Sequence, residues 1–146
     1  MATEILQKSR ARITAQGNGT ELTADTDPNS GSYTGDTPSV LDNRIAAGAG
    51  EPKGAEYLQL ELDVTTHTGG DTSVEIWYSI SEDGTNYTEW RYSHTVGETI
   101  LSAETPRCDA GIFVLSAQYN KLAAVARDVA LNAYLYATPK LMESQG

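Results

Sequence analysis

The sequence predicts an all-β protein, an antiparallel β-sandwich of jelly-roll or immunoglobulin-like type with an extended N-terminal arm. Apolar and polar residues alternate from residue 57 onward, as they do in strands with one face in a core and the other in water. Turn-forming residues recur about every ten positions, and no βαβ unit is evident. The 146 residues suit one domain. We divide it into an arm with long loops, 1–55, and the sandwich, 56–146.

The N-terminal region has little to bury. Residues 14–56 are predicted to be irregular, because Gly, Asn, Thr, Asp, Ser and Pro fill most of their first half. One apolar patch is expected to anchor this segment: Val40, Leu41 and Ile45. Such a polar segment is typical of an arm that orders on assembly and covers the sheet edges of neighbours.

Residues 5–13 are predicted to form a short strand or part of the arm. Basic side chains alternate along one side of this segment, at Lys8, Arg10 and Arg12. We expect this basic arm to dock on an acidic neighbour, such as the next copy of the chain, and we take these three residues as interface candidates.

Three strands are predicted in the first part of the sandwich. Leucine and valine alternate with polar residues over 57–64, and Val74, Ile76, Tyr78 and Ile80 do the same over 74–80. Residues 81–86 form a turn, since Asp83-Gly84 is a strong hairpin signal. A third strand is predicted over 87–92.

The C-terminal part is predicted to add weaker strands at about 98–103 and 111–117. Residues 121–127 contain four alanines, which favour a helix, but alternation continues over 129–136. We therefore predict two strands that meet near Arg127-Asp128. Pro139 is expected to end the last strand, because proline donates no ladder hydrogen bond.

The composition excludes several classes of protein. Net charge is −10, and residues 51–90 carry nine acidic residues against Lys53 alone, so we expect no nucleic-acid partner and no anionic membrane surface. The charge also serves solubility. No apolar run approaches the roughly 20 residues of a membrane helix, and charged residues interrupt the segment where a secretory signal would lie. A single cysteine, Cys108, excludes an internal disulfide and a Cys-based zinc cluster.

No constellation points to catalysis, so we expect neither an enzyme nor a cofactor. His67 and His94 lie in predicted loops without a matching nucleophile, acid or metal-ligand spacing. Hard oxygen ligands occur at calcium-loop spacing, but the glycine falls one place late and no helices flank them, so we interpret the segment as a polar loop. These four residues are Asp25, Asp27, Asn29 and Asp36.

Aromatic side chains offer a binding surface instead. Trp77, Trp90 and Tyr92 either pack at the core edge, form a protein interface, or provide a platform for sugars. Ser81-x-Asp83-Gly84-x-x-Tyr87 is similar to the Asp-box turn of sialidase propellers, but it occurs once and with one residue fewer before its glycine. We interpret it as a hairpin turn.

Residues 58–64 (LQLELDV), 74–80 (VEIWYSI) and 81–87 (SEDGTNY), followed by a late Tyr119-Asn120-Lys121-Leu122, form a pattern. It resembles small β-sandwich virion proteins of tailed bacteriophages, with lysine where those proteins usually have arginine. The likeness spans residues 56–138. It implies a structural role without catalytic residues.

The resemblance leads to a functional expectation. We expect a capsid decoration (cement) protein that binds the outer shell, bridges its subunits and self-associates. Its partners would be the major capsid protein or other virion proteins, and it would be assembled into virions in the host cytoplasm. A neck, tail or fibre protein and a carbohydrate-binding module are the alternatives.

Overall fold

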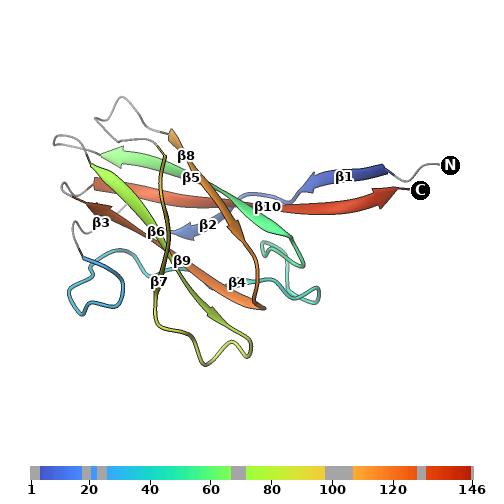
Figure 1. Cartoon of the computed structure of the whole chain (residues 1–146), viewed down its shortest axis with the longest axis horizontal. Coiled ribbons are helices and arrows are strands. Elements are labelled where there is room, and N and C mark those ends of the chain that lie inside the picture. The colour runs from blue at the N-terminus through green and yellow to red at the C-terminus, as the bar shows by residue number, and fades with distance from the viewer. Residues whose placement is uncertain are drawn as a thin grey trace.

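The computed structural model describes residues 4–17, 21–22, 26–66, 72–97, 107–127 and 131–145. Within these residues the chain forms ten strands and no helix, which confirms the all-β prediction. Two antiparallel sheets pack against each other as a β-sandwich (Figure 1). The strands are β1 (Glu4–Ser9), β2 (Ile13–Gln16), β3 (Glu21–Leu22), β4 (Leu41–Asp42), β5 (Tyr57–Thr66), β6 (Ser73–Ser81), β7 (Arg91–Thr95), β8 (Arg107–Val114), β9 (Tyr119–Arg127) and β10 (Leu131–Gln145).

The long strand β10 organises the six-stranded sheet. On one side β10 pairs with β5, which pairs in turn with β8. On its other side, the short strands β1, β2 and β3 pair with successive stretches of β10. The first 55 residues therefore contribute three strands to this sheet and β4 to the other.

One end of the six-stranded sheet narrows to two strands. β5 begins at Tyr57, opposite Lys140, so among the described residues 141–145 pair with β1 alone. β1 and this end of β10 form a ribbon that extends beyond the sandwich, with the start of β1 and the end of β10 at its tip (Figure 1). We call this part of the molecule the terminal ribbon.

The four-stranded sheet has the order β4-β9-β6-β7. β9 pairs with β6 along its whole length, from Ser73 opposite Arg127 to Ser81 opposite Tyr119. β7 lies on the far side of β6, and β4 adds only two residues beside the start of β9. Nine residues of ladder explain why the alanine-rich segment is a strand, since pairing and packing override helix propensity.

Alternate residues build the core, as predicted. Leu58, Leu60 and Leu62 of β5 are each no more than 1% exposed. Other core residues come from β10 in the same sheet and from β6 and β9 in the other: Leu131, Ala133, Leu135 and Ala137, Val74 and Ile76, and Leu122, Ala124 and Ala126. β8 adds Cys108, Ala110 and Phe113. Each buried leucine contributes about 2 kcal/mol to the stability of the fold.

One open side of the sandwich is closed by a buried glutamine. Gln16, at the end of β2, is 1% exposed. Its Oε1 accepts from the backbone N–H of Ala124 at 2.8 Å, and its Nε2 donates to the Tyr33 hydroxyl and the Asp36 carbonyl. The Tyr33 hydroxyl in turn donates to the Ala124 carbonyl. These bonds satisfy the backbone of Ala124 on the side of β9 that faces away from β6, where β4 pairs only with Tyr119 and Asn120 in the described ranges. They also hold the segment between β3 and β4.

The prediction that Pro139 ends the last strand is wrong. β10 continues through Pro139, which lies opposite Leu58, to Gln145. The Pro139 carbonyl accepts from the Arg10 N–H, so the backbone N and C=O of Pro139 both point away from β5. They face residues 10–12, which connect β1 to β2 and belong to neither strand. The missing N–H therefore costs no ladder bond.

Other boundaries also differ from the predictions. The third strand lies at Arg91–Thr95 instead of 87–92, because residues 82–90 form the turn and its return, and the strand predicted at 111–117 runs from Arg107 to Val114. The strand predicted at 98–103 lies outside the described residues. In the predicted anchor, only Leu41 is buried, whereas Val40 and Ile45 are 44% and 85% exposed.

Candidate functional site

Two of the three aromatic candidates meet on the outer face of the four-stranded sheet. Trp77 of β6 and Tyr92 of β7 are register partners, and their ring centroids lie 6.0 Å apart with the planes at 78°. A register shift between Ile76 and Trp77 brings this pair together. Tyr92 is 51% exposed. We call Trp77 and Tyr92 the aromatic platform.

A carboxylate and a guanidinium fix the platform. Glu75 accepts from the Trp77 Nε1–H at 3.0 Å and from Arg127 Nη2 at 2.8 Å. Burial by itself raises the pKa of Glu75, but the hydrogen bonds from Arg127 and Trp77 outweigh it, so the pKa lies below its usual value. Glu75 is therefore ionised at neutral pH and serves to orient the indole. The alternation over 74–80 predicts that Glu75 and Trp77 share one face of the strand. No signal in the sequence indicates that Arg127, which lies on β9, joins them.

Trp90 contributes through its backbone. Its N–H donates to Asn29 Oδ1 at 2.8 Å, and its carbonyl accepts from Asn29 Nδ2 at 2.8 Å. This two-point clamp ties the loop between β3 and β4 to the segment that leads into β7. The Asp27 carboxylate caps the Asn29 N–H within the same loop. Residues that we considered as calcium-loop ligands thus hold the loop together, and Asp25 lies outside the described residues.

The basic candidates lie on the other sheet and make contacts within the chain. Arg10 donates to the carbonyls of Pro52 and Lys53 at 2.9 and 3.1 Å. Arg12 pairs with Glu61 and lies 3.8 Å from the ring centroid of Tyr136. Lys8 is exposed on the terminal ribbon. The structure therefore does not bring the basic and aromatic candidates into one site.

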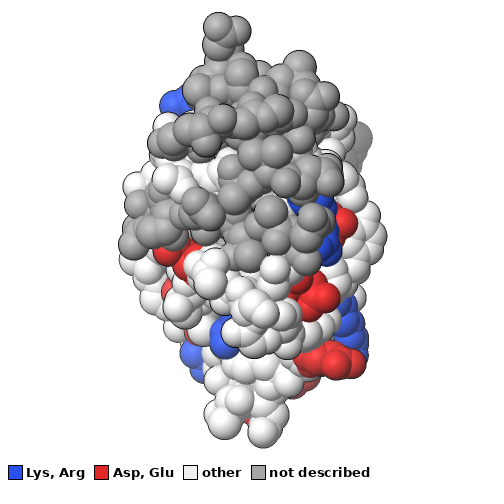
Figure 2. Space-filling view, turned by 90° about the vertical axis from the view of Figure 1, so that its left-hand side faces the viewer, with Lys and Arg blue, Asp and Glu red and all other residues white. Residues whose placement is uncertain are grey.

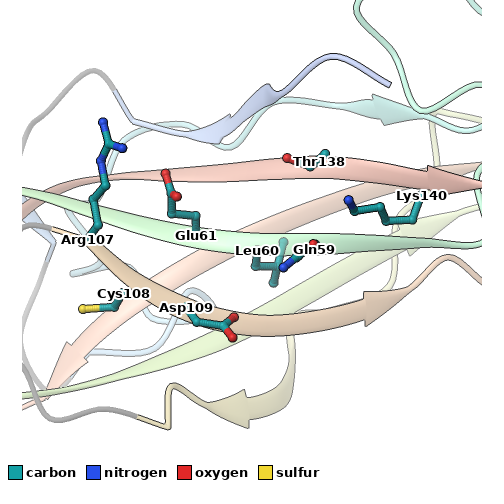
Figure 3. A pocket seen from close by; sticks show the side chains of 8 residues that line it. All are labelled: Gln59, Leu60, Glu61, Arg107, Cys108, Asp109, Thr138 and Lys140. Atoms are coloured by element: carbon teal, nitrogen blue, oxygen red, sulfur yellow. The ribbon is translucent and has the colours of Figure 1, made fainter. Parts of the chain in front are cut away.

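A shallow hollow of about 360 Å³ lies on the outer face of the six-stranded sheet. Figure 3 shows its lining on the neighbouring strands β8, β5 and β10, with Glu61 and Arg107 pointing to the same side. Acidic and basic groups alternate around it, and Glu61 is already paired with Arg12. The hollow is an open, mixed-charge surface and offers no enclosed site for a substrate.

Charge is mixed on the described surface. In Figure 2, which faces the side of the molecule opposite the terminal ribbon, acidic and basic groups lie next to each other along one side. Four ion pairs occur in the described part of the chain: Arg12–Glu61, Arg44–Asp42, Arg107–Asp63 and Arg127–Glu75. The more exposed pairs, such as Arg12–Glu61, contribute about 0–1 kcal/mol each, whereas Arg127–Glu75 is partly buried.

The Asp83-Gly84 segment is a turn, as predicted. Asp83 Oδ1 accepts from the N–H groups of Thr85 and Asn86, both at 2.8 Å, and Gly84 adopts a φ of 76°. The hydrogen bonds from Asn86 and Thr85 hold the pKa of Asp83 well below its usual range. Gly84 lies against the ring of Tyr119, where a Cβ would come within 3.1 Å. These contacts lock the turn on the body of the sandwich.

His94 also has a structural position. Its Nε2 lies 2.7 Å from the Ala110 carbonyl, so this nitrogen carries the proton, and its Nδ1 lies 2.9 Å from Ser93 Oγ. His67 lies outside the described residues. Within the described ranges, no group of three His, Cys, Asp or Glu residues is placed to hold a metal ion. The same ranges contain no helix long and apolar enough to cross a membrane.

Comparisons of the chain with protein-family models, with curated proteins and with solved structures give no significant match.

Proposed function

We propose that this chain is a virion structural protein of a tailed bacteriophage, and specifically a capsid decoration protein. In this role it binds the outer shell and stabilises it by bridging capsid subunits. The aromatic platform is the observation that carries the proposal, together with the likeness of residues 56–138 to phage sandwich proteins.

The platform supports binding rather than chemistry. Trp77 is held in place by Glu75, so little side-chain entropy is lost when a partner covers it. Large aromatic side chains are enriched at protein interfaces because each buries much area with few rotatable bonds. Glu75 is ion-paired with Arg127, which leaves this carboxylate committed to holding the indole.

The ring geometry favours a protein partner over a sugar. A sugar ring stacks on an aromatic face, but the two planes of the platform meet at 78° and form no continuous flat surface. An edge-to-face pair instead presents a raised, irregular contour that suits a pocket between capsid side chains. Saturable binding to a polysaccharide that disappears in Trp77→Ala or Trp90→Ala would support the carbohydrate-binding alternative.

Heat disruption of phage heads tests the proposal. Heads prepared without the protein are expected to break at a higher temperature after saturation with it. Trp77→Ala should weaken binding about thirtyfold, which corresponds to a loss of about 2 kcal/mol for a central aromatic contact. Ile112→Ser, an exposed apolar residue on the other sheet, is the matched control and should bind normally.

The position of the bound protein on the same heads distinguishes a decoration protein from a neck, tail or fibre protein. A decoration protein occupies equivalent positions over the whole shell, whereas a neck or tail protein occupies a single ring or fibre. Equal disruption temperatures with and without bound protein would count against the proposal.

A further inference from the structure

The outer edge of β7 lies next to the aromatic platform. β7 is the last strand of the four-stranded sheet, and among the described strands only β6 pairs with it. Tyr92, one of the two platform residues, belongs to β7 and is 51% exposed. A partner that reaches the platform therefore also reaches the backbone of this edge strand.

The register determines which backbone groups of β7 point outward. The Val96 N–H donates to the Val74 carbonyl, so alternate residues of β6, counted from Val74, direct their backbone groups toward β7 and the others toward β9. Trp77 belongs to the second set. Its register partner Tyr92 therefore directs its N–H and C=O away from β6. Among the described residues, none hydrogen bonds to these two groups of Tyr92.

Asn29 already occupies the neighbouring position on this edge. The N–H and C=O of Trp90, two residues before Tyr92, both bond to the Asn29 side-chain amide at 2.8 Å. An amide that accepts and donates in this way makes the same two bonds as a residue of a facing antiparallel strand. The edge of β7 thus accepts a peptide-like group at Trp90, and Tyr92 is the next position at which it can do so.

A cation lies beside this position. Arg91 is exposed, and within the described ranges no acidic side chain forms an ion pair with it. Because successive side chains of a strand point to opposite faces, Arg91 and the Tyr92 ring lie on different faces of β7. In a strand added to this edge, the residue that faces Tyr92 would cover the platform, and its neighbour would face Arg91.

We propose that an extended segment of the capsid protein pairs antiparallel with β7 at Tyr92. One residue of the segment exchanges two hydrogen bonds with Tyr92, and its apolar side chain packs on the aromatic platform. The next residue of the segment is acidic and faces Arg91, since opposite charges at facing positions stabilise a ladder. The segment leaves the edge after that residue, because Asn29 holds the backbone groups of Trp90.

This mode of binding is strand addition to a sheet edge, in which backbone hydrogen bonds provide affinity and side chains provide specificity. The inference rests on the proposed function, because it names the group on the capsid that the platform binds. It differs from a contact through the rings alone in that it requires the Tyr92 N–H.

Amide hydrogen exchange tests this requirement on the whole protein, free and bound to phage heads that were prepared without it. The Tyr92 amide should exchange about tenfold more slowly on the heads, as expected for one new hydrogen bond in the bound state. The Val96 amide is the internal control, because it donates to Val74 with or without a partner and should be protected in both samples.

A pair of substitutions separates the backbone of Tyr92 from its ring. Tyr92→Ala and Tyr92→Pro both remove the ring, but only proline also removes the N–H. Since this N–H points away from β6, proline breaks no ladder bond within the protein. Tyr92→Pro should therefore bind heads about fivefold more weakly than Tyr92→Ala.

Charge reversal tests the acidic neighbour in the segment. Arg91→Glu should weaken binding to the heads about fivefold, because it places like charges opposite each other. Arg107→Glu makes the same change in net charge on the six-stranded sheet, at a side chain that is 70% exposed, and should bind normally.

The outcomes distinguish this inference from the proposed function. If Trp77→Ala weakens binding but the Tyr92 amide exchanges equally fast on the heads and in solution, strand addition is wrong and the platform binds through its rings. Equal affinities of folded Tyr92→Pro and Tyr92→Ala would have the same meaning. The exchange rate in the wild type decides the question if the proline variant does not fold. If the protein does not bind heads at all, the inference and the proposed function are both wrong.

Discussion

His94 and Gly111 meet where the edges of the two sheets approach each other. His94 lies on β7, an edge of the four-stranded sheet, and Gly111 on β8, an edge of the six-stranded sheet. His94 Nε2 donates to the Ala110 carbonyl at 2.7 Å, and a Cβ on Gly111 would come within 2.9 Å of that nitrogen. Gly111 has a φ of 82° at a register shift between β5 and β8. The bulge thus makes room for the histidine that joins the two sheets on this side.

Gly111→Ala should therefore destabilise the protein. Alanine is strained at positive φ by about 1–2 kcal/mol, and its Cβ would push His94 away from the Ala110 carbonyl. We expect a total loss of about 2–3 kcal/mol in urea unfolding. Gly97→Ala is the control, because nothing lies within 4 Å of its added Cβ. If the two variants unfold at the same urea concentration, the joint between the sheets has no energetic importance.

Gln16 closes the opposite side, and its replacement by leucine should be costly. Gln16→Leu keeps the volume but removes three hydrogen bonds, to Ala124, Tyr33 and Asp36. Leaving the Ala124 N–H buried without a partner should account for most of a loss of about 3 kcal/mol. Gln59→Leu, at an exposed position of β5, should change stability by less than about 0.5 kcal/mol. A loss for Gln16→Leu no greater than this control would contradict the assignment.

Tyr33 makes stability fall at alkaline pH. Burial, and to a smaller extent the charge of Asp36, raises the pKa of Tyr33 from 10.0 to about 12, against the opposing hydrogen bond from Gln16. The folded state therefore holds the phenolic proton more tightly than the unfolded state. Its contribution is complete below pH 10 and is lost as the pH rises toward 12, by at most about 3 kcal/mol.

Urea unfolding of the wild type and of Tyr33→Phe at pH 8, 10 and 11 measures this effect. Tyr33→Phe should start from a lower stability, because Gln16 and Ala124 lose a partner, and should then decline less between pH 10 and 11. Equal declines in the two proteins would show that Tyr33 is not the titrating group.

Arg10 connects the root of the terminal ribbon to the turn at Pro52 and Lys53. Arg10→Ala should release this turn and make trypsin cleavage after Lys53 several-fold faster, since proteases select exposed, mobile segments. The two lost hydrogen bonds go to carbonyl oxygens, so global stability should fall by only about 1–2 kcal/mol. Lys8→Ala is the control. Unchanged cleavage after Lys53 in Arg10→Ala would mean that other contacts hold the turn.

The sequence was sufficient for elements whose signal is local. The alternation of apolar and polar residues predicts β5 and β6 and the strand character of β9 and β10. A period of two residues shows which face of a strand is buried, whichever strand pairs with it. Asp83-Gly84 identified the turn for the same reason, since its hydrogen bonds lie within five residues.

The long-range contacts could not be predicted in this way. The clamp between Asn29 and Trp90 joins positions 61 residues apart, and the bond from Ala124 to Gln16 joins positions 108 apart. The local rule for proline fails at Pro139, because a strand tolerates proline there only where the neighbouring strand β1 has ended. Arg127 beside Glu75 likewise required the β6–β9 register, so only part of the aromatic platform was predictable.

Electron cryo-microscopy of phage heads mixed with the purified protein will show where on the particle the protein binds. For a decoration protein we expect sandwich-sized density at equivalent positions over the outside of the shell, with Trp77 and Tyr92 turned toward the capsid. A bare shell at saturating protein, or density restricted to one vertex or to the tail, would contradict it.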